Sequence, residues 1–299
     1  MKRVLVTGAT GFIGRQCLPM LLEKGYEVHG TFLHGQTPHA ENVHWHQADL
    51  LDGNQLPDLV RRVAPTHLLL LAWNATPGVY VSSLDNVDWL RSSLQLVQLF
   101  KEFSGERVVG AGTCFEYDWS YGYCRESLTP LHPSTLYGTC KHALQLALAG
   151  FGKGAGLSSA WGRIFFLYGP NEYESRLVAS VISAVLRSET APCSSGKQIR
   201  DFLHVQDVAG AFVALLDSRV TGPVNIASGQ PITIGEVVET IGEQLERPDL
   251  IARGVLPDRP NEPSVLFADV SRLTSEVGYR PRHDLHSGLR DTISWWRRQ

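Results

Sequence analysis

Residues 3–14 read Arg3-Val4-Leu5-Val6-Thr7-Gly8-Ala9-Thr10-Gly11-Phe12-Ile13-Gly14, and this stretch decides the fold. The apolar run predicts a buried strand, and the following residues predict a helix over Arg15–Lys24 that Pro19 kinks or delays. A plain strand–turn–helix would also use glycines. The Gly-x-x-Gly-x-x-Gly spacing, however, suits a tight turn, a pyrophosphate against the backbone and close helix packing. The expected cofactor contacts are Gly8, Thr10, Gly11, Phe12 and Ile13.

Outward from this loop, short apolar strands alternate with amphipathic helices. Further strands are expected at Tyr26–Phe32, Val43–Ala48, Thr66–Ala72, Arg107–Ala111 and Ser159–Phe165, and helices at Gln55–Val63, Leu84–Phe103 and Thr135–Ala149. Apolar strands separated by helices predict a parallel sheet that is covered on both faces. The fold class is therefore α/β, with a Rossmann-type doubly wound sheet.

The pattern changes after Gly169. The remaining helices are expected at Arg176–Arg187, Val205–Asp217, Ile234–Leu245 and Ser287–Trp296, between short strands and loops rich in proline and glycine. We expect a dinucleotide-binding domain over residues 1–165, to which residues 203–227 return. Residues 166–202 and 228–299 should form a smaller C-terminal α/β lobe for the substrate.

The bulk composition excludes several classes of partner. With 27 basic and 30 acidic residues among 299, the formal charge is −3, which gives no electrostatic basis for binding nucleic acid or an anionic membrane. Five cysteines without a C-x-x-C pair favour a reducing, cytoplasmic location, and no stretch is long enough to span a membrane. His44 and His46 alternate on an expected strand without neighbouring carboxylates or thiolates, so no metal site is expected.

The choice between NAD(H) and NADP(H) stays open. A Rossmann fold usually has an acidic residue after the second strand, which binds the ribose 2′-hydroxyl. Here the strand ends without an acidic residue, which slightly favours NADP(H). Thr31 and His34 would then contact its 2′-phosphate. Asp49 and Leu50, after the third strand, are expected at the adenine, although Asp49 would equally cap a helix.

Tyr137 and Lys141 lie four residues apart, on one face of an expected helix. An ammonium near a phenol favours the phenolate and lowers the pKa of the tyrosine, as general acid–base chemistry requires. The preceding strand ends in Ala111-Gly112-Thr113, so a hydroxyl is available to polarise the same substrate oxygen.

Together these stretches resemble the extended short-chain dehydrogenase/reductases that act on nucleotide sugars as epimerases, dehydratases and reductases. The likeness runs from Thr7–Gly14 through Tyr137–Lys141 and Arg163–Pro170 to Asn225–Gly229. It implies that Thr113, Tyr137 and Lys141 form the catalytic triad, and that Asn86 supports the proton path. It also implies that Leu71 and Ala72 line the nicotinamide ribose site, where Tyr137 and Lys141 also contact the cofactor.

Two departures from the family pattern narrow the reaction. Family dehydratases carry an Asp-Glu pair directly after the catalytic threonine, whereas this chain has Cys114 and Phe115. Glu116 is expected on a strand, facing the other way. What remains is reduction of a 4-keto sugar or redox-neutral 4-epimerisation. A non-catalytic dinucleotide sensor is disfavoured because the Tyr–Lys pair is present.

The second departure lies in the expected substrate site, where Phe166 replaces an asparagine that contacts the substrate diphosphate in the family. Arginines are expected to hold the two phosphates instead, although each also fits a surface ion pair. The expected substrate contacts are Asn74, Thr76, Thr113, Cys114, Arg176, Arg200 and Arg259. The aromatic segment Tyr117–Tyr123 would either cover the sugar or pack beneath a loop.

The sequence therefore predicts an NAD(P)H-dependent reductase of a nucleoside-diphosphate 4-keto-6-deoxyhexose, with an NAD-containing 4-epimerase as the alternative. The resemblance implies a role in deoxysugar biosynthesis for lipopolysaccharide or another glycan. It also implies a homodimer built through Leu84–Phe103 and the catalytic helix. The sequence does not select among dTDP, GDP, CDP and UDP, nor does it identify the sugar.

Overall fold

A seven-stranded parallel sheet is the largest sheet in the computed structural model, which describes residues 2–258 and 262–299. Its strands are β1 (Arg3–Thr7), β2 (Glu27–Phe32), β3 (Val43–Gln47), β4 (His67–Leu70), β5 (Arg107–Thr113), β7 (Ser158–Ile164) and β11 (Gly222–Ile226). They lie in the order β11-β7-β5-β4-β1-β2-β3. The chain order reverses between β1 and β4, so a crevice opens there at the carboxyl ends of the strands.

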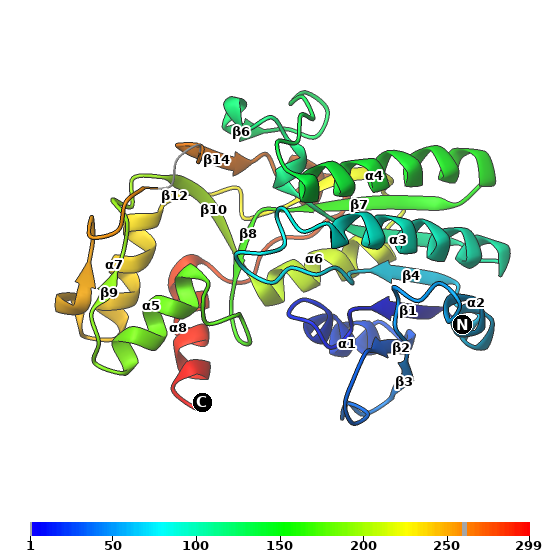
Figure 1. The fold of residues 1–299 in the computed structure, drawn as a ribbon, viewed down its shortest axis with the longest axis horizontal. Coiled ribbons are helices and arrows are strands. Elements are labelled where there is room, and N and C mark those ends of the chain that lie inside the picture. Colours follow the sequence, from blue (N-terminus) through cyan, green and yellow to red (C-terminus); the bar gives the residue numbers. More distant parts are fainter. Residues whose placement is uncertain (1, 259–261) are drawn as a thin grey trace.

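Helices cover both faces of this sheet, as Figure 1 shows. They are α1 (Gly14–Glu23), α2 (Leu56–Val63), α3 (Asp85–Glu102), α4 (Leu136–Ala155) and α6 (Val205–Asp217). Buried residues of α1 and α6 form one apolar core with the sheet, and those of α2, α3 and α4 form another. This is the doubly wound arrangement that the sequence predicts.

The C-terminal lobe has its own core. It contains α5 (Leu177–Leu186), α7 (Ile234–Gln244), α8 (Leu285–Trp296) and the strand pair β9 (Ala191–Pro192) with β13 (Ile251–Ala252). A second sheet has the order β12-β10-β14-β6, and β8 also pairs with β10. Its strands are β6 (Tyr123–Cys124), β8 (Phe166–Tyr168), β10 (Ile199–His204), β12 (Pro231–Thr233) and β14 (Val265–Ala268).

Short helical turns complete the chain: 3₁₀ turns at Cys114–Glu116, Trp119–Tyr121 and Pro248–Leu250, and a π-helical turn at Arg272–Glu276. Within residues 2–258 and 262–299, no helix is both long and apolar enough to cross a membrane.

Three details differ from the predicted elements. The helix α4 continues to Ala155, beyond the predicted end at Ala149, and it stops where Gly156 takes a φ of +65°. Helix α1 runs through Pro19 without interruption. Strand β6 lies within the predicted first domain but pairs with β14 of the second sheet, because the segment after β5 leaves the Rossmann sheet.

Candidate active site

The glycine loop closes one end of the cavity. Gly8 has a φ of +67°, which a residue with a side chain rarely adopts, and its carbonyl accepts a hydrogen bond of 2.9 Å from Gly11 N. A β-carbon on Gly14 would collide with Gly8 O, so only glycine lets α1 approach β1 this closely. The Thr7 hydroxyl accepts hydrogen bonds from the backbone of Leu71 and Ala72, which joins β1 to β4. The loop thus has the shape that a dinucleotide pyrophosphate requires.

A cavity of about 1070 Å³ extends from this loop to the C-terminal lobe. Twelve residues expected at the cofactor line it: Gly8, Thr10, Gly11, Phe12, Ile13, Thr31, Asp49, Leu50, Leu71, Ala72, Tyr137 and Lys141. His34 lies outside the lining, so it is not placed to contact a cofactor there. The Asp49 carboxylate accepts a hydrogen bond of 2.9 Å from Leu51 N within a turn, but the next helix, α2, begins at Leu56 with Gln55 as its N-cap, so Asp49 does not cap a helix.

The expected catalytic residues meet where β5 ends and α4 begins. The Thr135 hydroxyl caps α4 by accepting a hydrogen bond from Gly138 N, which places Tyr137 in the first turn and Lys141 one turn later. Thr113, at the end of β5, lines the same part of the cavity. The three side chains that the sequence assigns to catalysis are therefore gathered at one place.

Burial controls the protonation of this pair. Burial raises the pKa of Tyr137 above its ordinary value, and a hydrogen bond with Thr113 acts in the opposite direction. Lys141 Nζ lies 5.9 Å from the centre of the Tyr137 ring, and burial lowers its pKa to about 7. The sequence suggested that the ammonium would lower the pKa of the tyrosine, but in the structure desolvation is the larger effect.

Glu116 has a structural position instead of a catalytic one. It lies in a 3₁₀ turn and not on a strand, which corrects the sequence prediction, and its side chain is fully buried. Its carboxylate accepts hydrogen bonds of 2.8 Å from Thr113 N, Trp161 Nε1 and Arg163 Nε. Glu116 thereby fixes the backbone of Thr113 from behind.

Two arginines reach the substrate end of the cavity. Arg200 is 1% exposed, and its Nη2 lies 3.6 Å from Glu262 but has no hydrogen-bond partner among the described residues. Arg176 donates to Ala75 O over 3.4 Å. Cys114 also lines the cavity, and Arg259 lies outside the described residues. A guanidinium edge at a cavity wall that lacks a hydrogen bond suits a phosphate oxygen.

The loop after β4 differs from the prediction. Asn74 and Thr76 hydrogen-bond to each other and are absent from the cavity lining. Their neighbours Trp73, Ala75 and Pro77 line it instead. The predicted loop therefore lies at the cavity, whereas the predicted residues Asn74 and Thr76 are not part of its lining.

Sequence reasoning also missed an acidic residue at the cavity wall. Glu172 lines the cavity and buries its Oε2 without a hydrogen-bond partner in the described structure. Burial raises the pKa of this carboxyl to about 8, against the opposing charge of Arg176. A signal was present in its position two residues after the Gly169-Pro170 pair, which ends the strand motif.

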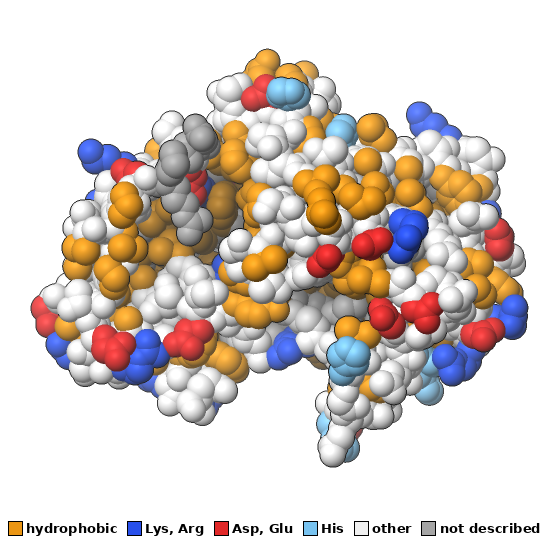
Figure 2. Space-filling model, in the orientation of Figure 1, with side chains coloured by type: hydrophobic (Ala, Val, Ile, Leu, Met, Phe, Trp, Pro, Cys, Tyr) orange, Lys and Arg blue, Asp and Glu red, His pale blue; other side chains and the backbone are white. Residues whose placement is uncertain are grey.

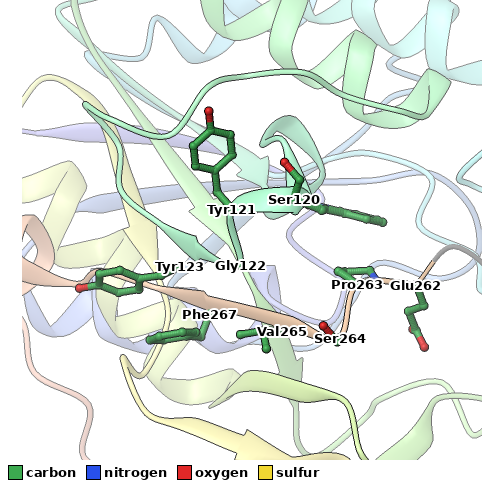
Figure 3. A pocket seen from close by; sticks show the side chains of 10 residues that line it. Ser120, Tyr121, Gly122, Tyr123, Glu262, Pro263, Ser264, Val265 and Phe267 are labelled. Atoms are coloured by element: carbon green, nitrogen blue, oxygen red, sulfur yellow. The ribbon is translucent and has the colours of Figure 1, made fainter.

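The aromatic segment contributes both to buried packing and to the wall of the cavity. Tyr117 is buried and donates to Asn225 Oδ1, whereas Trp119 lines the main cavity. Figure 3 shows the neighbouring pocket of about 670 Å³, where Tyr123 lies beside Phe267 and Glu262 marks the far end. Trp119 and Glu262 belong to both pockets, so the two adjoin at these residues.

The histidines on the sheet edge have a carboxylate beside them, contrary to the prediction. Glu27 Oε1 lies 3.0 Å from His29 Nε2, and His29 Nδ1 lies 2.9 Å from His46 Nε2. Arg3 Nε also pairs with Glu27 at 3.0 Å. These side chains therefore partner one another on β1, β2 and β3.

The fold and the gathered Thr113, Tyr137 and Lys141 define a short-chain dehydrogenase/reductase type of enzyme. A family model described as "NAD dependent epimerase/dehydratase family" matches residues 4–227, and the chain belongs to this family. The family is NAD dependent, so the cofactor is NAD(H), and the slight preference for NADP(H) inferred from the sequence is not supported.

Curated relatives carry several activities. The chain is 26% identical to the dTDP-6-deoxy-L-talose 4-dehydrogenase (NAD(+)) of Aggregatibacter actinomycetemcomitans, over 79% of this chain and 88% of that protein. It is 25% identical to the UDP-glucuronate 4-epimerase of Thermodesulfobacterium geofontis, over 99% and 96% of the two chains. The family is thus shown more firmly than the individual reaction.

Solved structures agree on the fold. The UDP-glucose 4-epimerase of Thermus thermophilus in complex with NAD has a TM-score of 0.87 and 26% identity, with 99% of both chains covered. MoeE5 in complex with UDP-glucose and NAD has a TM-score of 0.84 and 30% identity, also with 99% of both chains covered.

Proposed function

We propose that this protein is an NADH-dependent reductase of a nucleoside-diphosphate 4-keto-6-deoxyhexose. The observation that carries the proposal is the pair Cys114 and Phe115, which stands where family dehydratases carry two acids. Burial raises the pKa of the Cys114 thiol, so it stays protonated and cannot act as a base at neutral pH. Glu116, the nearest carboxylate in sequence, is committed to Arg163 and Trp161. Reduction at C4 needs none of these groups.

The glycine loop, Tyr137 and Lys141 would hold NADH in the cavity, and when bound it would supply the hydride for the sugar carbon. Tyr137 donates its phenolic proton to the C4 oxygen, and the Thr113 hydroxyl hydrogen-bonds to the same oxygen. The raised pKa of Tyr137 keeps the phenol protonated for this task. As the phenol loses its proton, the nearby Lys141 ammonium stabilises the negative charge that forms.

The rest of the cavity fits a nucleotide sugar. Arg200 and Arg176 both line the cavity, and the buried Nη2 of Arg200 has no hydrogen-bond partner among the described residues, so these two arginines are available for the diphosphate. Phe115, Trp119 and Phe166 give the sugar region apolar surface, which suits a C6 methyl group. The activity named for the Aggregatibacter relative, at C4 of a 6-deoxy sugar, supports this assignment.

A redox-neutral 4-epimerase is the second candidate, and the close structural match to the Thermus UDP-glucose 4-epimerase favours it. One assay separates the two. The protein is mixed with NADH and the dTDP-, GDP-, CDP- or UDP-linked 4-keto-6-deoxyhexose, and in parallel with NAD and the corresponding NDP-hexose. The reductase consumes NADH in one of the first mixtures. Formation of an epimer in the second set, without net change of the cofactor, would assign the epimerase instead.

A further inference from the structure

The side chain of Trp73 lies directly over the Lys141 ammonium. Lys141 Nζ is 3.9 Å from the centre of the indole ring, well inside the range of a cation–π contact. The same nitrogen donates a hydrogen bond of 2.8 Å to Ala111 O. Lys141 is buried, so these two contacts replace much of the water that a free ammonium would bind.

Asn86 holds the indole in this position. Its Oδ1 accepts a hydrogen bond of 2.8 Å from Trp73 Nε1, and its Nδ2 donates to the carbonyls of Tyr80 and Ser83 over 2.7 Å each. Asn86 is itself buried, with 2% of its surface exposed. The amide therefore fixes the tryptophan through one bond and is fixed by two others.

We propose that Trp73 is a positioning residue of the reaction centre, whose indole face favours the ammonium form of Lys141 and holds it in place, with Asn86 as the anchor of the indole. The effect of Trp73 on Lys141 does not depend on the proposed function; only the predicted effect on kcat rests on it. The resemblance assigned Asn86 to the proton path, whereas these contacts give it the task of holding Trp73.

The charges around Lys141 leave its ammonium without a free carboxylate partner, so the contact with Trp73 matters for its stability. In the described structure, the titratable side chains that face Lys141 are Tyr137 on its own helix and Glu116 behind β5. Glu116 is already neutralised by Arg163 at 2.8 Å. The π-face thus provides attraction that no free carboxylate supplies at this site.

Lysine titration tests the proposal directly, because the chain contains six lysines and Lys141 is the buried one among them. The full-length protein with lysine labelled by ¹³C at Cε is titrated by NMR, with Lys141→Arg to assign the signal. In Trp73→Leu we expect the Lys141 midpoint to fall by about one pH unit, since a desolvated cation–π contact is worth roughly that much. Trp73→Phe should restore most of the wild-type midpoint.

A matched control uses Trp89, which stacks on Trp73 at 6.2 Å but is not among the rings that contact Lys141. Trp89→Leu should leave the midpoint unchanged. If Trp73→Leu does not fold, fluorinated tryptophan incorporated throughout the chain weakens the π-face without changing its shape. It should lower the midpoint in wild type and have no effect in Trp73→Phe.

An unchanged midpoint in Trp73→Leu, or in the fluorinated protein, would overturn the proposal. The titration needs no sugar substrate, so its result is independent of the reductase assay. If the reductase is also correct, the alkaline limb of kcat should move to lower pH in Trp73→Leu and return in Trp73→Phe.

Discussion

Among single residues, Tyr137 carries the proposed proton transfer. Tyr137→Phe removes the phenolic proton while keeping the ring against Tyr80 and Phe115. Because general acid catalysis contributes roughly 10²–10⁴-fold, we expect kcat to fall by about that factor while the Kd for NADH changes little. Steady-state kinetics and fluorescence titration with NADH measure both. Retention of most of the activity would contradict the proposed mechanism.

Glu116 and Arg163 form a buried ion pair, in which the two side chains are 0% and 1% exposed. Glu116→Ala leaves Arg163 charged in the interior, so the free energy of unfolding should drop by about 3–5 kcal/mol. Urea denaturation gives this value. A loss of activity without a loss of stability would point instead to a catalytic carboxylate.

Glu172 gives a pH-dependent prediction. Burial raises the pKa of Glu172 to about 8 in the folded protein, so the folded state holds this proton more strongly than the unfolded chain does. This contribution is complete below the ordinary glutamate pKa and is lost as the pH rises through about 8. The Tm of wild type should therefore fall relative to Glu172→Gln between about pH 5 and 8. Parallel Tm profiles of the two proteins would show that the carboxyl does not titrate in this way.

At the level of elements, the turn between β1 and α1 depends on close packing at Gly14. Gly14→Ala places a methyl group against Gly8 O and should weaken NADH binding by more than tenfold, measured by fluorescence titration. Gly150→Ala in α4 is the matched control, since nothing lies within 4 Å of the added carbon. It should stabilise the protein by about 0.5–1 kcal/mol. Equal NADH affinity in both variants would contradict the packing argument.

The elements themselves could largely be read from the sequence. The pattern of apolar strands and amphipathic helices identified the strands of the main sheet up to β7 and placed the start of the catalytic helix at Thr135, one residue before it begins in the structure. Strand β6 has two residues, too few for a periodic pattern, and its partner β14 lies far along the chain. Long-range pairing of this kind leaves no local signal.

The candidate site was predictable only where local pattern determined it. The glycine loop follows from its spacing, whereas the triad of Thr113, Tyr137 and Lys141 follows from the family resemblance; all of them line the same cavity. Whether Asn74 or Trp73 faces the cavity depends on the backbone path after β4, which the sequence does not encode locally. The buried surroundings of Lys141 and Glu172 come from packing between distant segments.

At the scale of the whole molecule, the outer helices of the sheet suggest a dimer. Figure 1 shows α3 and α4 side by side, and Figure 2 shows hydrophobic side chains gathered over this region. Large apolar side chains exposed on or beside these helices are Leu84, Val87, Leu94, Leu146 and Phe151. Apolar surface of this kind on paired helices suits a four-helix interface with a second copy.

Sedimentation at micromolar concentration should therefore give a dimer, and Leu94→Glu should shift the equilibrium to monomer. Leu128→Glu is the control, because Leu128 is exposed in the loop before α4. A monomeric wild type would contradict the prediction, as would an unchanged dimer in Leu94→Glu.

Transfer of deuterium tests the central claim most directly. The protein is supplied with NADH that carries deuterium at nicotinamide C4, on either face, together with the 4-keto-6-deoxyhexose nucleotide that it accepts, and the product is examined by NMR. With one of the two labelled faces, we predict a single deuterium at sugar C4 for each NADH oxidised. A sugar product without deuterium at C4 from both labelled forms would contradict the proposed function.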